Sequence, residues 1–138
     1  MGRIMAIDYG KKRCGIAVTD PLGLIANALT TVPSISLLSF IENYMQKEEV
    51  DCIVVGEPKQ MDASPSESSR FIEPFVKKLR KTYPKLKVER VDERFTSKIA
   101  FQTMIDAGLK KKQRGDKALI DAISATLILQ MYMQKLEK

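Results

Sequence analysis

The chain contains no histidine and only two cysteines among its 138 residues. Without histidine it cannot build a Ser-His triad, a histidine general base or a histidine-rich zinc site. Carboxylates then become the candidates for catalysis or metal binding, and hard oxygen ligands favour Mg²⁺ or Mn²⁺. Cys14 and Cys52 each lie in an apolar, strand-like context, which predicts buried thiols rather than a disulfide or a redox pair.

Long apolar runs are also missing from the sequence. No segment approaches the roughly 18 apolar residues that span a bilayer, and the most apolar stretch, ALIDAISATLILQMYM, is interrupted by Asp121. The N-terminus lacks the charged and then apolar layout of a signal peptide. We therefore expect a cytoplasmic protein with no membrane partner.

Aromatic residues make up only 7% of the chain, and no array of stacking rings is visible. This argues against a platform that binds single strands by base stacking. What the chain has in excess is positive charge, because 23 Lys and Arg against 17 Asp and Glu give a net charge of +6. That balance suits a polyanionic partner such as nucleic acid, but it does not prove one.

The first part of the chain predicts a three-stranded antiparallel meander. Two β-rich runs, RIMAID and CGIAVTD, are separated by a short turn at residues 9–13, and a third run, LIANALTTV, follows a Pro-Leu-Gly turn. A helix capped by Ser34 or Ser36 should then extend to about Lys47. The continuous apolar run CIVVG predicts a strand buried on both faces, which is typical of parallel pairing.

A second helix is predicted by the capping box SPSE at residues 64–67, which has proline at the first helical position. Pro74 interrupts the apolar stripe of this helix and predicts a kink. The stripe consists of Phe71, Ile72, Phe75, Val76 and Leu79.

The rest of the chain predicts one strand and two helices. KVERVDE, residues 87–93, reads as a polar edge strand, a helix capped by Thr96 ends at Gly108, and the last helix begins near Asp116. The resulting order βββαβαβαα contains no repeat and no long linker. We therefore expect a single domain over residues 1–138.

Carboxylates follow three of the predicted strands. Asp8 ends the first, Glu57 follows the buried one, and Asp92 and Glu93 end the last. If these strands are neighbours, their carboxyl ends meet at one edge of the sheet. Asp121 lies on a core-facing stripe of the last helix, where an unpaired charge is costly. A cation held between Asp8, Glu93 and Asp121 would answer that cost, and two such ions would support phosphodiester cleavage.

Each of these carboxylates also has a purely structural interpretation. Asp8 could accept hydrogen bonds from its own turn, and Asp121 could pair with Lys117 or Arg94. Glu93 could belong to a solvated strand end.

Basic segments flank two of the proposed ligands. GKKR follows Asp8, and KKKQRGDK occupies residues 110–117, where phosphate contacts would hold a nucleic-acid backbone beside the site. A charge run alone is as often a solvated surface. The candidates for phosphate contact are Lys11, Lys12, Arg13 and Arg94.

Four blocks, AIDYGKKRCGIAVTD, VVGEPKQMDAS, VDERFTS and DKALIDAISATLILQMYM, resemble the signature blocks of the YqgF/RuvX family. These are Holliday-junction-resolvase-like proteins, also described as pre-16S rRNA nucleases. The resemblance implies an α/β, RNase H-like fold in which helices flank a five-stranded mixed sheet of order 3-2-1-4-5. It further implies a metal-dependent nuclease that processes the 5′ end of pre-16S rRNA in ribosome biogenesis, with its acidic positions at Asp8, Glu93 and Asp121.

The sequence departs from the family pattern at Glu57, where the family commonly has leucine, so no role passes to that residue. Ser124 replaces a usual alanine. A Holliday junction resolvase acting on branched DNA and a non-catalytic nucleic-acid-binding factor stay open as alternatives, as does the oligomeric state. Phosphotransfer of the sugar-kinase and actin kind is disfavoured, because that architecture needs two such domains and 138 residues supply one.

Overall fold

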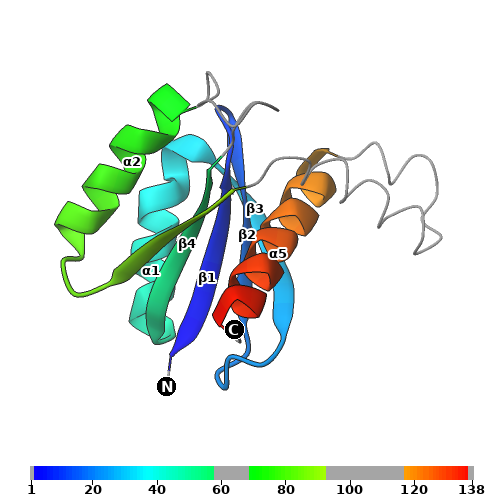
Figure 1. Cartoon of the computed structure of the whole chain (residues 1–138). Coiled ribbons are helices and arrows are strands. Elements are labelled where there is room, and N and C mark those ends of the chain that lie inside the picture. The colour runs from blue at the N-terminus through cyan, green and yellow to red at the C-terminus, as the bar shows by residue number, and fades with distance from the viewer. Residues whose placement is uncertain (1, 58–68, 93–116, 137–138) are drawn as a thin grey trace.

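The computed structural model describes residues 2–57, 69–92 and 117–136. Figure 1 shows a sheet with α1 and α2 on one side and α5 on the other. The strands are β1 (Arg3–Tyr9), β2 (Arg13–Thr19), β3 (Ala26–Pro33), β4 (Val50–Glu57) and β5 (Lys87–Asp92). The helices are α1 (Leu37–Lys47), which follows the short 3-10 turn η1 (Ser34–Ser36), α2 (Ser69–Thr82) and α5 (Lys117–Leu136).

The five strands form one mixed sheet in the order β3-β2-β1-β4-β5, which is the order that the family resemblance implied. β1, β2 and β3 pair antiparallel, so the predicted meander is confirmed. β4 pairs parallel with β1, and β5 pairs parallel with β4 as the predicted edge strand. The carboxyl ends of β1, β4 and β5 therefore meet at one edge of the sheet.

Large apolar side chains fill the space between the sheet and the helices α1 and α2. Burial of such side chains contributes most of the favourable free energy of folding. Together they form the main core of the described chain. Its fully buried members include Met5, Ile7, Ile16, Ile41, Ile53, Ile72 and Leu79.

Small side chains line much of the opposite face, beneath α5. Side chains alternate along a strand, so Ala6 of β1 faces α5 while its neighbours Met5 and Ile7 face the main core. Ala17 of β2 and Ala125 of α5 are also completely buried on this side. Ile128, Leu129 and Tyr132 of α5 belong to the same cluster, and the backbone of α5 meets the sheet closely near the start of the helix, at Gly15.

The predicted serine cap of the first helix is confirmed in position only, because Ser36 is the N-cap residue of α1. Ser36 precedes α1, but its side chain makes no capping hydrogen bond. Ser34 lies in η1, and its hydroxyl donates instead to the carbonyl oxygen of Gly10 at 2.5 Å. The Ser34 hydroxyl, which the sequence assigned to a helix end, thus binds the turn between β1 and β2 instead.

The predicted apolar stripe of α2 is buried except at its first position. Four members are buried as expected, but Phe71 is 40% exposed. The helix continues through Pro74 to Thr82, and the kink expected at Pro74 stays a prediction. The capping box at 64–67 and the helix expected at 96–108 lie outside the described residues.

Two predictions drawn from missing residue types can be compared with the structure. Cys14 and Cys52 are both buried and free, as their apolar contexts predicted. Among the helices that the structure describes, none combines the length and the apolar character needed to cross a bilayer.

Candidate functional site

Asp8 is the penultimate residue of β1 and lies on the α5 side of the sheet. Side chains alternate along the strand, and Ala6, two residues earlier, packs beneath α5. Asp8 is partly buried. In the antiparallel ladder of β1 and β2, its partner is Gly15.

The beginning of α5 packs directly on Gly15. A Cβ atom added to this glycine would collide with the backbone oxygen of Asp121. Glycine is therefore required here by the close approach of a helix backbone rather than by a turn. Because Gly15 is the ladder partner of Asp8, the same contact brings the backbone of Asp121 next to the residue that pairs with Asp8, although Asp8 and Asp121 are far apart in sequence.

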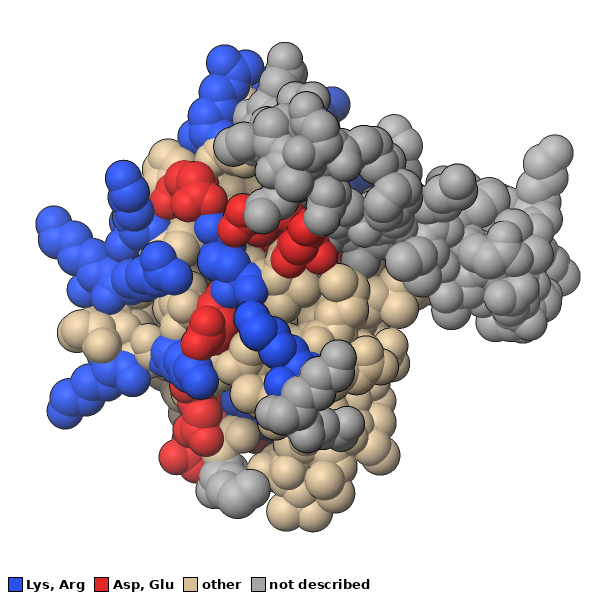
Figure 2. Space-filling model, in the orientation of Figure 1, with Lys and Arg blue, Asp and Glu red and all other residues tan. Residues whose placement is uncertain are grey.

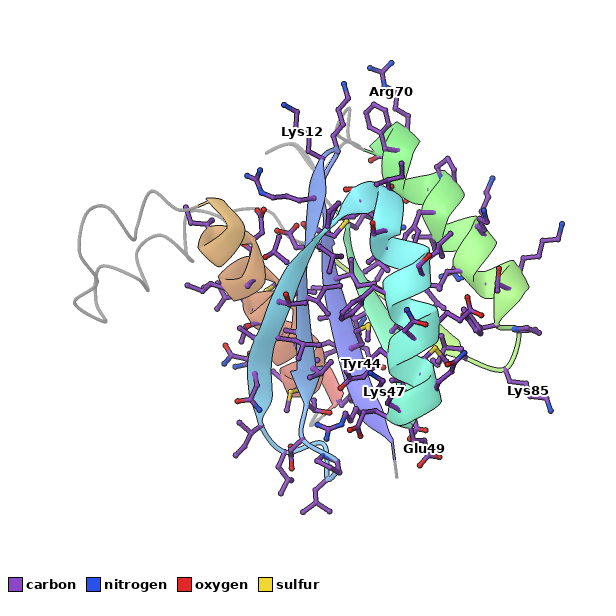
Figure 3. The ribbon with its side chains drawn as sticks, turned by 180° about the vertical axis from the view of Figure 1, so that it is seen from behind. Lys12, Tyr44, Lys47, Glu49, Arg70 and Lys85 are labelled. Atoms are coloured by element: carbon purple, nitrogen blue, oxygen red, sulfur yellow. The ribbon has the colours of Figure 1, made fainter. Side chains whose placement is uncertain are left out.

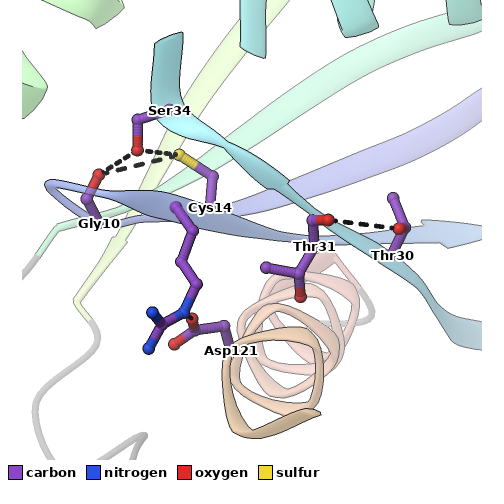
Figure 4. A network of polar contacts seen from close by, with 7 residues as sticks. Gly10, Cys14, Thr30, Thr31, Ser34 and Asp121 are labelled. Carbon is purple, nitrogen blue, oxygen red and sulfur yellow. Dashed lines mark hydrogen bonds and ion pairs between the residues drawn. The ribbon is translucent and has the colours of Figure 1, made fainter. Parts of the chain in front are cut away.

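Asp121 forms an ion pair with Arg13, the first residue of β2. The Arg13 Nε donates to the Asp121 Oδ2 at 2.6 Å, and the side chains are 36% and 25% exposed (Figure 4). The sequence suggested Lys117 and Arg94 as partners of Asp121 and missed Arg13. Nothing about the side chains of Lys117 and Arg94 is described. A residue proposed to contact phosphate is thus bound to a residue proposed to bind metal.

The turn between β1 and β2 carries the other two cations of the GKKR motif. Lys11 and Lys12 are exposed, and this turn borders a hollow of about 380 Å³ that Asp121 also lines. Ser34 fixes the turn from outside, because its backbone N–H donates to the Lys12 carbonyl oxygen at 3.0 Å and its hydroxyl donates to Gly10. Figure 3 shows Lys12 at the tip of the hairpin.

The pKa of the Cys14 thiol is raised by burial and by the charges of Asp8 and Asp121. Burial is the main cause that raises the pKa of Cys14, and the negative charges of Asp8 and Asp121 raise it further. Hydrogen bonds with Ser34 and Gly10 lower the pKa by less, so the shift stays upward. The thiol is therefore neutral near neutral pH, which gives it no nucleophilic character.

Glu57 and Asp92 end β4 and β5 and are ladder partners. Two residues before Glu57, Val55 packs in the main core, and two residues before Asp92, Arg90 reaches α2. The alternation of side chains therefore places both carboxylates on the opposite side of the sheet from Asp8.

Glu93 and Arg94 lie outside the described residues. In the chain, Glu93 directly follows Asp92, the last residue of β5. Within residues 2–57, 69–92 and 117–136, no group of three or more His, Cys, Asp or Glu side chains could hold a metal ion. The described ranges thus contain two of the three predicted ligands, and the metal site stays a prediction.

Sequence reasoning did not assign two residues that shape this site, Gly15 and Ser34, to it. Gly15 stands inside an apolar strand, which is itself a signal for close backbone approach. Ser34 carried no comparable signal, because its position near a helix start favoured a capping role.

A five-stranded mixed sheet of this order, flanked by helices on both faces, has the architecture of an RNase H-like protein. The family described as "RuvX: Holliday junction resolvase" matches residues 2–135. The chain belongs to this family.

Individual relatives are similar over nearly their whole length. The chain is 56% identical over 135 residues to a protein of Flavobacterium psychrophilum, which covers 98% of each chain. It is 60% identical over 134 residues to a protein of Bacteroides thetaiotaomicron, with 97% of each chain covered. A protein of Phocaeicola vulgatus is 61% identical over 134 residues, which cover 97% of this chain and 96% of the relative. All three relatives bear the name "Putative pre-16S rRNA nuclease".

Proposed function

We propose that this chain hydrolyses phosphodiester bonds in pre-16S rRNA and that Asp8, Glu93 and Asp121 hold one or two Mg²⁺ or Mn²⁺ ions. The observation that carries the proposal is the contact between Gly15 and Asp121, which brings the backbone of Asp121 against the ladder partner of Asp8. The names of the relatives support pre-16S rRNA as the substrate.

The described donors fit a hard divalent cation. Asp8 and Asp121 supply carboxylate oxygens, and both side chains are only partly buried, so solvent and substrate can reach them. A bound ion of this kind activates water and stabilises the leaving oxygen in phosphodiester cleavage.

Arg13 can serve the site in two ways, as the partner of Asp121 and as a contact for phosphate. Its guanidinium neutralises Asp121 in the structure described, and a guanidinium is also a good match for phosphate oxygens. We expect Arg13 to leave Asp121 when metal binds there and to contact a substrate phosphate. Lys11 and Lys12 would hold the adjacent backbone as point charges.

Cleavage of end-labelled pre-16S rRNA precursor tests this function, with a four-way DNA junction in parallel reactions. Each substrate is incubated with Mn²⁺ or with EDTA, and Asp8→Asn serves as the matched control because it removes the charge and keeps the shape. We expect cleavage of the RNA that requires Mn²⁺ and disappears in the variant.

The junction reactions test the description that the RuvX family carries. If the junction is cut and the RNA is not, the chain is a DNA resolvase and the RNA substrate is wrong. If neither is cut at high enzyme concentration while both bind in EDTA, a non-catalytic nucleic-acid-binding factor is the better account.

A further inference from the structure

A second hollow lies on the other side of the sheet from Asp8. Its volume is about 260 Å³, and its lining is mostly apolar. Sites for drug-sized ligands occupy about 300–1,000 Å³, so this pocket suits one flat group. Among its lining residues are Tyr9, Ile35, Leu38, Phe71, Pro74 and Lys78. We call it the Phe71 pocket.

The rim of the Phe71 pocket exposes apolar surface that the core does not use. Ile35 is 95% exposed, and Phe71 is 40% exposed although its neighbours on the stripe of α2 are buried. Tyr9 and Phe75, which both line the pocket, form a ring pair with centroids 5.0 Å apart.

Two cations lie close to the exposed ring of Phe71. The Lys11 Nζ lies 5.5 Å from the centroid of Phe71, and the Arg70 Cζ lies 5.6 Å from it. Both distances fall within the range in which a cation is attracted to an aromatic face. Among the residues that line the pocket in the described ranges, Lys78 is charged and none is a carboxylate.

The charge of α2 extends this positive surface. The helix carries five Lys and Arg residues and one acid, Glu73, which is paired with Arg90. Figure 2 shows Lys and Arg side chains along the side where Figure 1 places α2. In Figure 3, Lys12 and Arg70 lie at the same end of the molecule.

Arg90 also holds α2 in place beside the sheet edge. Besides its ion pair with Glu73, its guanidinium donates to the carbonyl oxygens of Val55 at 3.1 Å and Gly56 at 3.3 Å. The Arg90 side chain is only 15% exposed. The exposed ring of Phe71 therefore stands on a helix that is tied to the carboxyl end of β4.

We propose that the Phe71 pocket binds an unpaired base of the RNA substrate, with the neighbouring phosphates contacted by Lys11, Arg70 and Lys78. An aromatic face flanked by cations is the combination that recognises bases splayed out of a single strand. Lys11 lines the hollow beside Asp121 and also approaches the ring of Phe71, so one strand can reach both places. The proposal rests on the proposed function and adds a single-stranded segment to its substrate.

The low aromatic content of the chain does not conflict with this pocket. That content argues against an array that stacks many bases, whereas the Phe71 pocket needs one ring for one base. When Lys11 and Arg70 move from the Phe71 ring to the phosphates of the RNA, the face of the ring becomes free for the base.

Binding of a 12-nucleotide RNA that contains one 2-aminopurine tests the pocket in EDTA, where metal-dependent cleavage is prevented. The RNA is used single-stranded and as a duplex with its complement. Phe71→Ala should weaken single-strand binding by about 5- to 150-fold and abolish the quenching of 2-aminopurine, while duplex binding falls less than twofold. Phe71→Trp keeps an aromatic ring and should retain both signals.

Leu29→Ala is the matched control, because Leu29 is 41% exposed and lies on β3, at the other edge of the sheet. A second variant, Ile35→Asp, places a negative charge on the rim at a site too exposed to affect folding, and it should also weaken single-strand binding. Equal losses for single strand and duplex, or wild-type binding in Phe71→Ala, would overturn the proposal.

The cleavage assay separates this proposal from the proposed function. If wild-type protein cuts no substrate but its binding depends on Phe71, the pocket stands and the nuclease function fails. If the protein cuts RNA and binding does not depend on Phe71, the nuclease stands and the pocket fails.

Discussion

The two faces of the sheet are built from side chains of different size. Beneath α1 and α2, Ile, Leu, Met and Phe side chains fill a wide space and stabilise the fold. Beneath the start of α5, Gly15 brings the helix backbone into contact with the sheet, and alanines continue the close packing. Asp8 and Asp121 lie on this second face, and none of the fully buried core residues in the described ranges is charged.

We infer that the two faces contribute differently to stability and to the geometry of the site. The face with large side chains supplies free energy of folding, and the face with small side chains sets the separation between a strand and a helix. A change on the first face should therefore alter stability, whereas a change on the second should alter the geometry of the site.

Leu79→Ala should have the largest effect on stability. Leu79 is completely buried in α2, so truncation removes apolar contacts and leaves a cavity, at a cost of about 2–5 kcal/mol. Urea unfolding measures this loss. Cleavage per folded molecule should stay near the wild-type value, and its disappearance in a variant that is still folded would contradict the division between the faces.

Gly15→Ala should disturb the packing of α5 on the opposite face of the sheet. The added methyl group must displace the backbone at Asp121, and such overpacking costs about 1–3 kcal/mol. Cleavage should fall far more than in Leu79→Ala, although the loss of stability is the same or smaller. Gly15→Ala with wild-type cleavage would show that the contact does not position Asp121.

The same contrast explains what the sequence could predict. The strands and the main core follow from local apolar patterns, such as CIVVG and the stripe of α2. The pair between Arg13 and Asp121 joins residues 108 positions apart, and no local pattern encodes such a contact. Phe71 was grouped with the buried stripe because periodicity gives the direction of a side chain but not where the covering layer ends.

Arg13→Gln should shift the balance between metal and RNA. Loss of a partly exposed ion pair worth about 0.2–1 kcal/mol should strengthen Mn²⁺ binding by about 1.5- to 5-fold, and RNA binding in EDTA should weaken. Titrations with Mn²⁺ and with RNA measure the two affinities. Lys12→Gln is the control, because it should weaken RNA binding alone; if Arg13→Gln also leaves Mn²⁺ affinity unchanged, Arg13 does not compete with metal.

The thiol of Cys14 predicts a small effect at alkaline pH. Its pKa is raised in the folded protein, chiefly by burial, so the stability linked to it is complete below the unfolded thiol pKa of about 8.5 and is lost as pH rises toward the folded value. Between pH 8 and pH 9 the loss is at most about 0.7 kcal/mol. Urea unfolding at both pH values should show a smaller decrease for Cys14→Ala than for wild type; equal decreases would assign the effect to other groups.

We infer that Asp8 and Asp121 serve one site because Gly15 lets α5 reach the sheet. Mn²⁺ binding followed by the electron paramagnetic resonance of the free ion tests it in wild type, Asp8→Asn, Asp121→Asn and the double variant. We predict that each single substitution weakens the same Mn²⁺ site and that the double variant loses clearly less affinity than the sum of the two, as expected for residues that act together. Fully additive losses, or a single variant that binds Mn²⁺ like wild type, would contradict the claim.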